Sequence, residues 1–467
     1  MKRSTAALAA CAVVIGTAAT VLPQAMAAAQ GCRVDYTVTS QWQGGFQGAV
    51  KLTNLGDQVS GWSLTIAFPA GQRVTQGWNA TWSQSGTTAT ATNVDWNRTL
   101  GTGASTDLGF VGSWTGSNPV PTSFALNGVA CTGSTTTTST TSTTTTTTTT
   151  NPPVGTTPVA INGQLRVCGV YLCNQYNKPI QLRGMSTHGI QWFGKCYNNA
   201  SLDALATDWK SDLFRVAMYV QEQGYETNPS GFTSQVNSLV DMAEARGMYA
   251  IIDFHTLTPG DPNYNLERAK TFFASVASRN AAKKNVIYEI ANEPNGVSWA
   301  AIKNYAEQVI PVIRAADPDA VVLVGTRAWS SLGVSEGSNE TEVINNPVNA
   351  TNIMYTFHFY AASHKDNYRA TVSRAAARLP LFVSEFGTVT ATGGGAYDQA
   401  STAAWLNLLD QLKIGYANWT YSDANESSAA FRPGTCNGST YTGSSVLTDS
   451  GAYIKSRIST PDSFPTS

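Results

Sequence analysis

Short apolar runs recur along the chain after residue 158, and segments with helical spacing separate most of them. Residues 286–291, VIYEIA, have the length and the side chains of a buried strand. Residues 298–318 open on a serine that can cap a helix and end at a proline. Eight strand-like runs occur in all: 180–187, 213–220, 248–255, 286–291, 320–325, 353–360, 381–386 and 415–421. This alternation predicts an α/β fold, a (β/α)8 TIM barrel, over residues 159–460.

A doubly wound open sheet is the alternative interpretation of the same alternation. Such sheets often bind dinucleotides at a GxGxxG turn after an early strand. No early strand-like run is followed by that motif. The barrel is therefore the favoured interpretation.

Residues 30–132 have a different pattern, with short runs of alternating apolar and polar residues separated by turn residues. No helical pattern is visible there, so we expect an all-β sandwich. Residues 133–158 are almost pure Thr, Ser and Pro, which cannot form a packed core. We interpret them as an extended linker between two modules.

The first 29 residues have the features of a secretory signal peptide: a basic start, an apolar stretch and small residues near residues 25–29. Residues 8–11 resemble a lipoprotein cleavage box, but they lie too close to the basic start. We expect a secreted, extracellular protein without a membrane span. Export favours disulfides among the six remaining cysteines. We expect Cys32 to pair with Cys131, since they bracket the first module. For the other four cysteines one possible pairing is Cys168 with Cys173 and Cys196 with Cys436, but the sequence leaves the choice open.

Composition narrows the class of ligand. Only 13% of the residues are charged and the net charge is −1, so we expect neither nucleic acid nor a membrane surface as a partner. Aromatic residues make up 10% of the chain, including 12 tryptophans. Few charges and many aromatic rings suit neutral ligands such as sugars. We also expect the protein to be a monomer.

Polar residues stand where the strand-like runs end. A TIM barrel brings the carboxyl ends of its strands onto one face, where active sites lie. We therefore expect a site there. Three of the four histidines of the chain stand at strand ends; we interpret the fourth, His364, as a surface residue. The strand-end residues are His188, Arg215, Tyr219, His255, Asn292, Glu293, His358, Tyr360, Glu385 and Trp419.

Glu293 and Glu385 are the most informative pair among these residues. Their strands, the fourth and the seventh, lie across the barrel mouth, so the two carboxyl groups can face each other over a cleft. Cleavage of a glycosidic bond needs such a pair, one protonated and one ionised. A divalent metal held by both glutamates with His255 and His358 is the rival hypothesis, but no tight ligand motif is present. We expect neither a metal nor a cofactor.

The motifs at these strand ends resemble those of glycoside hydrolase family 5, and most closely its bacterial endoglucanases. They are LRGMSTHGIQWFG (182–194), FRVAMY (214–219), DFHT (253–256), EIANEPNG (289–296), TFHFYA (356–361), VSEFGT (383–388), ANWTYSD (417–423) and the ESSAA that follows. The resemblance implies that Glu293 is the general acid/base and Glu385 the nucleophile.

The same resemblance implies roles for the neighbouring residues. Arg215 would keep Glu385 ionised, Tyr360 would contact Glu385, and His358 would tune Glu293. Asn292 would bind the sugar 2-hydroxyl, His255 would support the centre, and Trp419 would stack beneath the sugar. His188, Trp192 and Tyr219 would line glucose subsites, and Glu426 would bind a neighbouring sugar. The chain departs from the family pattern at Ala424–Asn425, where a lysine is expected.

The first module resembles a family 2 carbohydrate-binding module through SQWQGGF (40–46), residues 61–86, VDWNRTL (94–100) and FALNGVAC. The resemblance implies that Trp42, Trp78 and Trp96 form a flat strip that stacks on cellulose. Trp62 lies in an alternating run and is expected in the core. Trp82 and Trp114 are left open, and Trp82 could extend the strip.

Together these features predict a two-module retaining endo-β-1,4-glucanase that cuts cellulose and soluble β-1,4-glucans. A β-mannanase or a mixed-linkage glucanase on the same fold is the enzymatic alternative. A polysaccharide-binding protein with an inactive barrel is disfavoured, because both carboxylates and their supporting residues are present.

Overall fold

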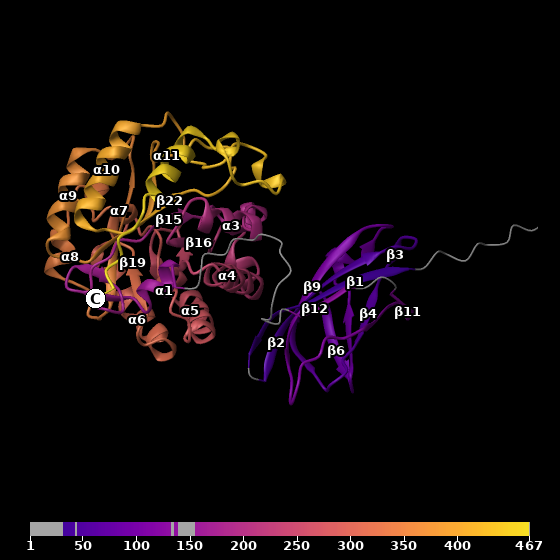
Figure 1. Ribbon diagram of the computed structural model, residues 1–467. Coiled ribbons are helices and arrows are strands. Elements are labelled where there is room, and N and C mark those ends of the chain that lie inside the picture. Colours follow the sequence, from indigo (N-terminus) through magenta and orange to yellow (C-terminus); the bar gives the residue numbers. More distant parts are fainter. Residues whose placement is uncertain (1–30, 43, 132–134, 139–154, 467) are drawn as a thin grey trace, which may run out of the picture. The chain divides into compact units, whose positions relative to one another are not determined.

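The computed structural model describes residues 31–42, 44–131, 135–138 and 155–466 (Figure 1). The chain divides into two compact units, one up to residue 146 and one from residue 147. The predicted signal peptide and most of the predicted linker lie outside the described residues. Within the described part of the chain, no helix is long and apolar enough to cross a membrane.

The first unit is a β-sandwich, as predicted. One sheet has the order β12-β1-β2-β9-β5 and the other β11-β10-β4-β7-β6. Rings from the two sheets meet in the core, where Tyr36 contacts Phe124. The strands of the two sheets are β1 (Cys32–Trp42), β2 (Gly45–Asn54), β4 (Ser63–Ala67), β5 (Arg73–Trp78), β6 (Thr81–Ser85), β7 (Thr88–Thr92), β9 (Ser105–Ser113), β10 (Ser123–Leu126), β11 (Val129–Ala130) and β12 (Thr135–Thr138).

Two ends of the segment predicted as a linker belong to these folded units. β12 lies in that segment and pairs in parallel with β1. At the other end, Thr157 caps α1 (Pro158–Asn162), which belongs to the second unit. A short two-stranded sheet of β3 (Val59–Ser60) and β8 (Thr99–Leu100) completes the sandwich.

The second unit is a closed barrel of eight parallel strands, which confirms the predicted fold. The last strand pairs with the first, so the barrel has no open edge. Its strands are β15 (Arg183–Ser186), β16 (Leu213–Tyr219), β17 (Tyr249–His255), β18 (Val286–Glu289), β19 (Val321–Val324), β20 (Ile353–Tyr360), β21 (Leu381–Gly387) and β22 (Tyr416–Trp419). A hairpin of β13 (Arg166–Cys168) and β14 (Tyr171–Cys173) precedes them.

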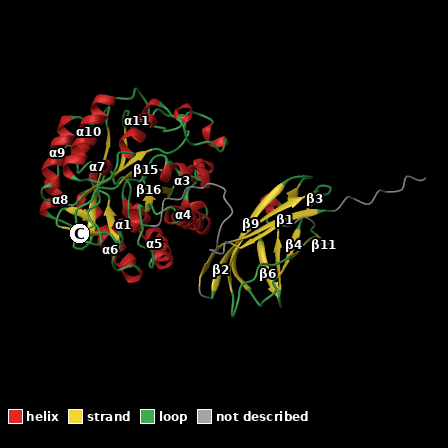
Figure 2. Ribbon diagram, viewed as in Figure 1, coloured by secondary structure: helices red, strands yellow, loops and turns green. Residues whose placement is uncertain are grey.

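Helices surround the barrel (Figure 2). The helix α6 begins at the cap that the sequence predicts, where Ser298 accepts a hydrogen bond from the amide of Ala301. Asp398 caps α10 in the same way through the amide of Ser401. The helices after α1 are α2 (Ile190–Phe193), α3 (Asn199–Thr207), α4 (Pro229–Glu244), α5 (Leu266–Asn280), α6 (Trp299–Ala316), α7 (Arg327–Ser330), α8 (Thr341–Asn345), α9 (Asp366–Ala376), α10 (Gln399–Leu412) and α11 (Asp449–Ile458).

Strand alternation fills the barrel interior in layers. On β16, Leu213 belongs to an apolar cluster with Ile251 and Ile287 of the next two strands. Two residues further along, Arg215 contacts charged residues of β17 and β18. Because side chains on one face of a strand recur every second residue, apolar residues close the amino end and polar ones gather toward the carboxyl end.

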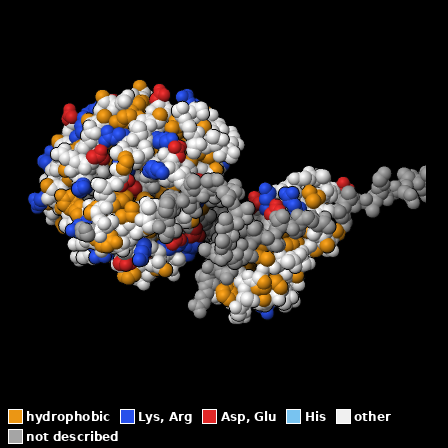
Figure 3. Space-filling view, in the orientation of Figure 1, with side chains coloured by type: hydrophobic (Ala, Val, Ile, Leu, Met, Phe, Trp, Pro, Cys, Tyr) orange, Lys and Arg blue, Asp and Glu red, His pale blue; other side chains and the backbone are white. Residues whose placement is uncertain are grey.

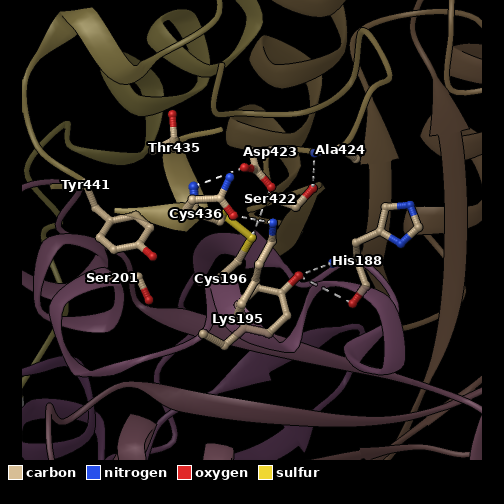
Figure 4. The surroundings of a disulfide bond; sticks show 12 residues. His188, Lys195, Cys196, Ser201, Ser422, Asp423, Ala424, Thr435, Cys436 and Tyr441 are labelled. Atoms are coloured by element: carbon tan, nitrogen blue, oxygen red, sulfur yellow. Dashed lines mark hydrogen bonds between the residues drawn. A yellow bond between two sulfur atoms is a disulfide. The ribbon is translucent and has the colours of Figure 1, made fainter. Parts of the chain in front are cut away.

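Three disulfides join the cysteines in the pairs named above. Cys32–Cys131 closes the sandwich, Cys168–Cys173 links β13 to β14, and Cys196–Cys436 joins the loop after α2 to a loop after β22. Figure 4 shows the surroundings of the third bond. There Asp423 accepts hydrogen bonds from the amides of Gly434 and Cys436, each at 3.0 Å, so the carboxylate and the disulfide hold the same loop.

Candidate active site

A cleft of about 490 Å³ opens at the carboxyl ends of the barrel strands. It brings together nearly all the strand-end residues that the sequence singles out. Arg215 lies beneath the cleft, and Trp192 lies beside Tyr219 with 39% of its surface exposed. The predicted residues that line the cleft are His188, Tyr219, His255, Asn292, Glu293, His358, Tyr360, Glu385, Trp419 and Glu426.

Arg215 organises the buried side of the site. Its Nε donates to Glu289 at 2.7 Å, and one terminal nitrogen donates to Glu385 at 3.1 Å and to Ser186 at 3.1 Å. The other terminal nitrogen donates to Asn292 at 2.7 Å and lies 2.9 Å from Asp253. Through four hydrogen bonds and the ion pair with Asp253, this fully buried cation contacts three carboxylates and an amide.

Glu385 is held as a carboxylate. Oε2 accepts from Arg215, and Oε1 accepts from the Tyr360 hydroxyl at 2.9 Å. Burial would raise the pKa of Glu385, but the charges of His358 and Arg215 outweigh it and hold that pKa below its usual value. Glu385 also lines the cleft.

Glu293 has the opposite environment. Its Oε1 lies 2.9 Å from Nδ1 of His358, and it has no cation of the guanidinium type beside it among the described residues. Burial raises the pKa of Glu293, the hydrogen bond with His358 opposes that change, and the charge of Glu385 adds to it. The two glutamates thus have pKa values shifted in opposite directions, as an acid and a nucleophile require.

His255 supports these groups as a neutral ring. Burial and the charge of Arg215 lower the pKa of His255 to about 3, so this ring is neutral. Its Nδ1 lies 2.7 Å from Asp253, and its Nε2 lies 3.2 Å from the Asn292 amide nitrogen. Since Asn292 Oδ1 already accepts from Arg215, the amide NH₂ faces His255, and Nδ1–H of His255 donates to Asp253.

An aromatic wall forms one side of the cleft. The His255 ring stacks on Tyr219, with centroids 4.1 Å apart, and on Trp419, with centroids 5.6 Å apart. Nε1 of Trp419 donates to Glu426 at 3.2 Å, and Nε2 of His188 lies 3.5 Å from the same oxygen. These contacts orient the Trp419 ring in the cleft.

The prediction that His364 is only a surface residue is wrong. His364 is half-buried and lines the cleft. Its Nδ1 accepts from the Tyr360 amide at 2.9 Å, and its ring stacks on Tyr368 at 4.3 Å. It follows the sixth strand by four residues, so the loop rather than the strand brings it to the mouth.

Sequence reasoning also missed residues of two kinds. Trp329, 44% exposed, lines the cleft after β19, and its amide donates to the carbonyl of Pro294. An exposed tryptophan just after the fifth strand is a signal that could have found it. Glu289 and Ser384 are fully buried below the cleft, where single polar residues inside apolar runs give little warning of function.

A group of possible metal ligands exists at this site. Ligand atoms of Glu293, His358 and Glu385 lie within 4.8 Å of one another. Each of these side chains has a hydrogen-bond partner: His358 for Glu293, Arg215 and Tyr360 for Glu385. His255, the fourth ligand of the metal hypothesis, is engaged by Asp253 and Asn292 instead. A metal-free site stays a prediction.

The sandwich presents two of the three predicted surface tryptophans. Trp96 is 70% exposed, and Trp78 is partly exposed and lies over Gly109, where a Cβ would come within 2.1 Å of the indole. Only glycine permits this close approach. The side chain of Trp42 lies outside the described residues, although its backbone ends β1.

The other tryptophans of this unit pack inward. Trp62 is buried and donates to the carbonyl of Asn97 at 2.7 Å, which confirms it as a core residue. Trp82 and Trp114 are half-buried against the same core, Trp82 through the ring of Phe110 at 4.9 Å. This packing does not favour Trp82 as an extension of the strip.

Comparison with known proteins places both units in families. Residues 173–425 match the family described as cellulase (glycosyl hydrolase family 5), and residues 32–131 match the family described as cellulose binding domain. The chain is 73% identical to Endoglucanase CelA of Streptomyces lividans over 468 residues, covering 100% of both proteins. It is 51% identical to Endoglucanase E-5 of Thermobifida fusca over 440 residues, covering 94% of each.

A solved structure supports the same assignment. The catalytic domain of the Thermobifida fusca endoglucanase Cel5A, in complex with cellotetraose, superposes with a TM-score of 0.65 at 58% identity. It covers 65% of this chain and 100% of that domain. The chain therefore belongs to the cellulase family, glycosyl hydrolase family 5, and carries an N-terminal cellulose-binding domain of the matching family.

Proposed function

We propose that this protein is a secreted, retaining endo-β-1,4-glucanase that hydrolyses internal bonds of cellulose and soluble β-1,4-glucans by double displacement. The observation that carries the proposal is the opposite environment of two facing carboxyl groups. Glu385 is held ionised by Arg215, while Glu293 is partly buried beside His358 and has a raised pKa. Oxygens of the two groups lie within 4.8 Å, which fits the separation of roughly 5–5.5 Å between carboxyl groups in retaining enzymes.

In the first step, a carboxylate oxygen of Glu385 attacks the anomeric carbon as Glu293 gives its proton to the glycosidic oxygen. The carbon–oxygen bond to the leaving chain breaks, and a glycosyl ester forms on Glu385. In the second step, Glu293, now ionised, takes a proton from water, whose oxygen attacks the same carbon. Glu385 leaves as a carboxylate and Glu293 is protonated again, so the anomeric configuration is retained.

The surrounding residues take supporting roles in this scheme. Arg215 and Tyr360 stabilise the Glu385 carboxylate that leaves in the second step. The amide of Asn292, fixed by Arg215 and His255, is placed to bind the sugar 2-hydroxyl. Trp419 offers a ring face to the sugar at the cleavage point, and His188, Trp192, Tyr219 and Glu426 surround neighbouring sugars.

The relatives support the choice of substrate. Those at 73% and 51% identity are both called endoglucanases, and the homologous catalytic domain was crystallised with cellotetraose, a β-1,4-linked glucan fragment. We infer that Trp42, Trp78 and Trp96 hold the enzyme on cellulose and that a linker keeps the catalytic unit close to the surface. Secretion rests on the signal-like residues 1–29, and a monomer stays our expectation.

Two assays test the proposal. Release of reducing ends from carboxymethyl cellulose should exceed release from galactomannan and from mixed-linkage glucan; a preference for galactomannan would favour the mannanase alternative. Proton NMR of the first-formed product should show the β-anomer. An α-anomer appearing first would exclude double displacement and would require a water between the carboxyl groups.

A further inference from the structure

Two side chains connect the proposed acid to a carboxylate that the reaction scheme does not use. Glu289, the last residue of β18, is fully buried, and its Oε1 accepts a hydrogen bond from Ser384 Oγ at 2.5 Å. Ser384 Oγ lies 2.9 Å from Nε2 of His358, and Nδ1 of His358 lies 2.9 Å from Glu293. The four groups form one hydrogen-bonded chain from β18 through β21 and β20 to the cleft.

The donors of this chain can be assigned. Glu289 accepts from Arg215 at one oxygen and from Ser384 at the other, so it is an ionised carboxylate. A hydroxyl carries one proton, and that of Ser384 is committed to Glu289. Ser384 can therefore only accept from His358, which requires a hydrogen on Nε2. Nδ1 is left facing Glu293, with one proton between them.

We propose, on the basis of the proposed function, that Glu289 and Ser384 are positioning residues: they fix the His358 ring so that, at the start of each cycle, its Nδ1 and Glu293 share one proton. The pair then exists either as a carboxylic acid beside a neutral ring or as a carboxylate beside an imidazolium. In the first step the proton goes to the leaving oxygen, and in the second the proton taken from water restores it. The proton count of the pair is the same after each cycle.

The charges around His358 favour this arrangement on balance. Four carboxyl groups face the ring and favour a positive charge on it: Glu289 of β18, Glu293 just after β18, Glu385 of β21 and Asp253 of β17. Arg215 and His255 disfavour a positive charge on His358. Burial would lower the pKa of His358, but the carboxylates of Glu289, 3.7 Å from Nε2, and of Glu293, 2.9 Å from Nδ1, outweigh burial and raise that pKa to about 9. The shared proton is therefore kept at neutral pH and lost as the pH rises through this value.

The test is the pH dependence of kcat/KM for Ser384→Ala and Glu289→Gln in the full chain. The substrate is a soluble cello-oligosaccharide, whose leaving group needs a proton. The alkaline limb should move to lower pH by about one unit or more, a loss of roughly tenfold at a fixed alkaline pH. The acidic limb should move much less. On an activated aryl β-cellobioside, whose leaving group needs no proton, the variants should show no loss of kcat/KM at alkaline pH relative to the parent.

Two further variants separate positioning from a general structural role. Ser384→Thr keeps the hydroxyl and should restore the parent profile. Asp253→Asn removes another carboxylate from Arg215 but lies on the His255 side, so it should lower the rate about equally at all pH values. Ser384→Ala keeps every charge, so it carries the test even where Glu289→Gln does not fold.

Two results would overturn the inference. One is a parent-like alkaline limb in Ser384→Ala, and the other is an equal loss at every pH on both substrates, which indicates only structural damage. These results leave the proposed function intact. A parent enzyme that hydrolysed neither substrate would instead overturn the proposed function and this inference together.

Discussion

The two units of this protein use aromatic and charged residues in opposite ways. In the barrel, charged groups such as Arg215 and Glu289 are fully buried, and each is held by several partners. In the sandwich, the predicted contact residue Trp96 is 70% exposed, while the core is built from rings such as Tyr36 and Phe110. Figure 3 shows charged side chains of both signs scattered over the visible surface of the barrel unit, without a field of one sign.

The difference follows from the two tasks. Bond cleavage needs carboxyl groups with opposite protonation, and shifts of this kind require burial and fixed neighbours. Attachment to a flat polysaccharide needs exposed ring faces and little else. The comparison therefore predicts that polar substitutions cost the barrel most in stability and chemistry, whereas ring substitutions on the sandwich cost only adhesion.

The largest effect is expected for Arg215→Met. Removing this cation leaves Asp253, Glu289 and Glu385 buried without their shared partner, which should lower the free energy of unfolding of the barrel by about 3–5 kcal/mol and abolish hydrolysis. Arg73→Met, an exposed arginine of the sandwich, is the matched control and should change stability by less than about 0.5 kcal/mol. Denaturant unfolding of the two variants measures this; equal effects would break the comparison.

The next effect is the loss of adhesion. Replacing Trp42, Trp78 and Trp96 by Ala should weaken binding to crystalline cellulose roughly tenfold or more, because stacking residues carry most of such binding. The rate on a soluble oligosaccharide should stay at the parent value. Leu55→Ala, which removes a 51% exposed apolar side chain of the same unit, is the control. A triple variant that pelleted with cellulose like the parent would refute the strip.

The disulfides of the barrel should differ in effect. Cys196–Cys436 spans 240 residues and Cys168–Cys173 only 5. Loop-closure entropy grows with length, so replacing the first pair by Ser should lower the free energy of unfolding by roughly 2–4 kcal/mol, and replacing the second pair by less. Thermal unfolding of both double variants compares them. The reverse order would show that the loop held by Asp423 is stable without its disulfide.

A smaller effect is expected on the acidic side of the pH profile. The Tyr360 hydroxyl donates to Glu385 and stabilises its charged form, so Tyr360→Phe should raise the pKa of Glu385 toward its usual value. In the proposed scheme Glu385 must be ionised to attack, so the acidic limb of kcat/KM should move to higher pH while the alkaline limb stays. An unchanged acidic limb would mean that Arg215 and His358 alone set this pKa.

Much of this arrangement could be predicted, because in a barrel the position of a residue along its strand determines whether it reaches the active-site face. Runs such as 286–291 show where strands lie, and a polar residue at the end of each run is brought to one face by the fold itself. That is why Glu293, His358 and Glu385 could be grouped before any coordinates. The Cys32–Cys131 disulfide could be predicted because the two cysteines flank one module. The pairing of the other four cysteines is decided only by the structure.

The residues that were missed depend on partners that sequence does not reveal. Glu289 contacts Arg215 and Ser384, which lie 74 and 95 residues away along the chain. His364 and Trp329 reach the cleft through loops whose path is set by tertiary contacts. One such contact is the hydrogen bond from the Trp329 amide to the carbonyl of Pro294. The start of the Thr-rich segment joins the sandwich as β12, although its composition indicates only a linker.

The central claim is that the two glutamates have opposite roles, and azide rescue tests it most directly. With an activated aryl cellobioside, Glu385→Gly plus azide should give the α-azide, since azide replaces the missing nucleophile. Glu293→Ala plus azide should give the β-azide, since azide replaces water in the second step. Both product configurations can be read by NMR. The opposite pair of products would contradict the assignment and, with it, the inference drawn from the environments of Glu293 and Glu385.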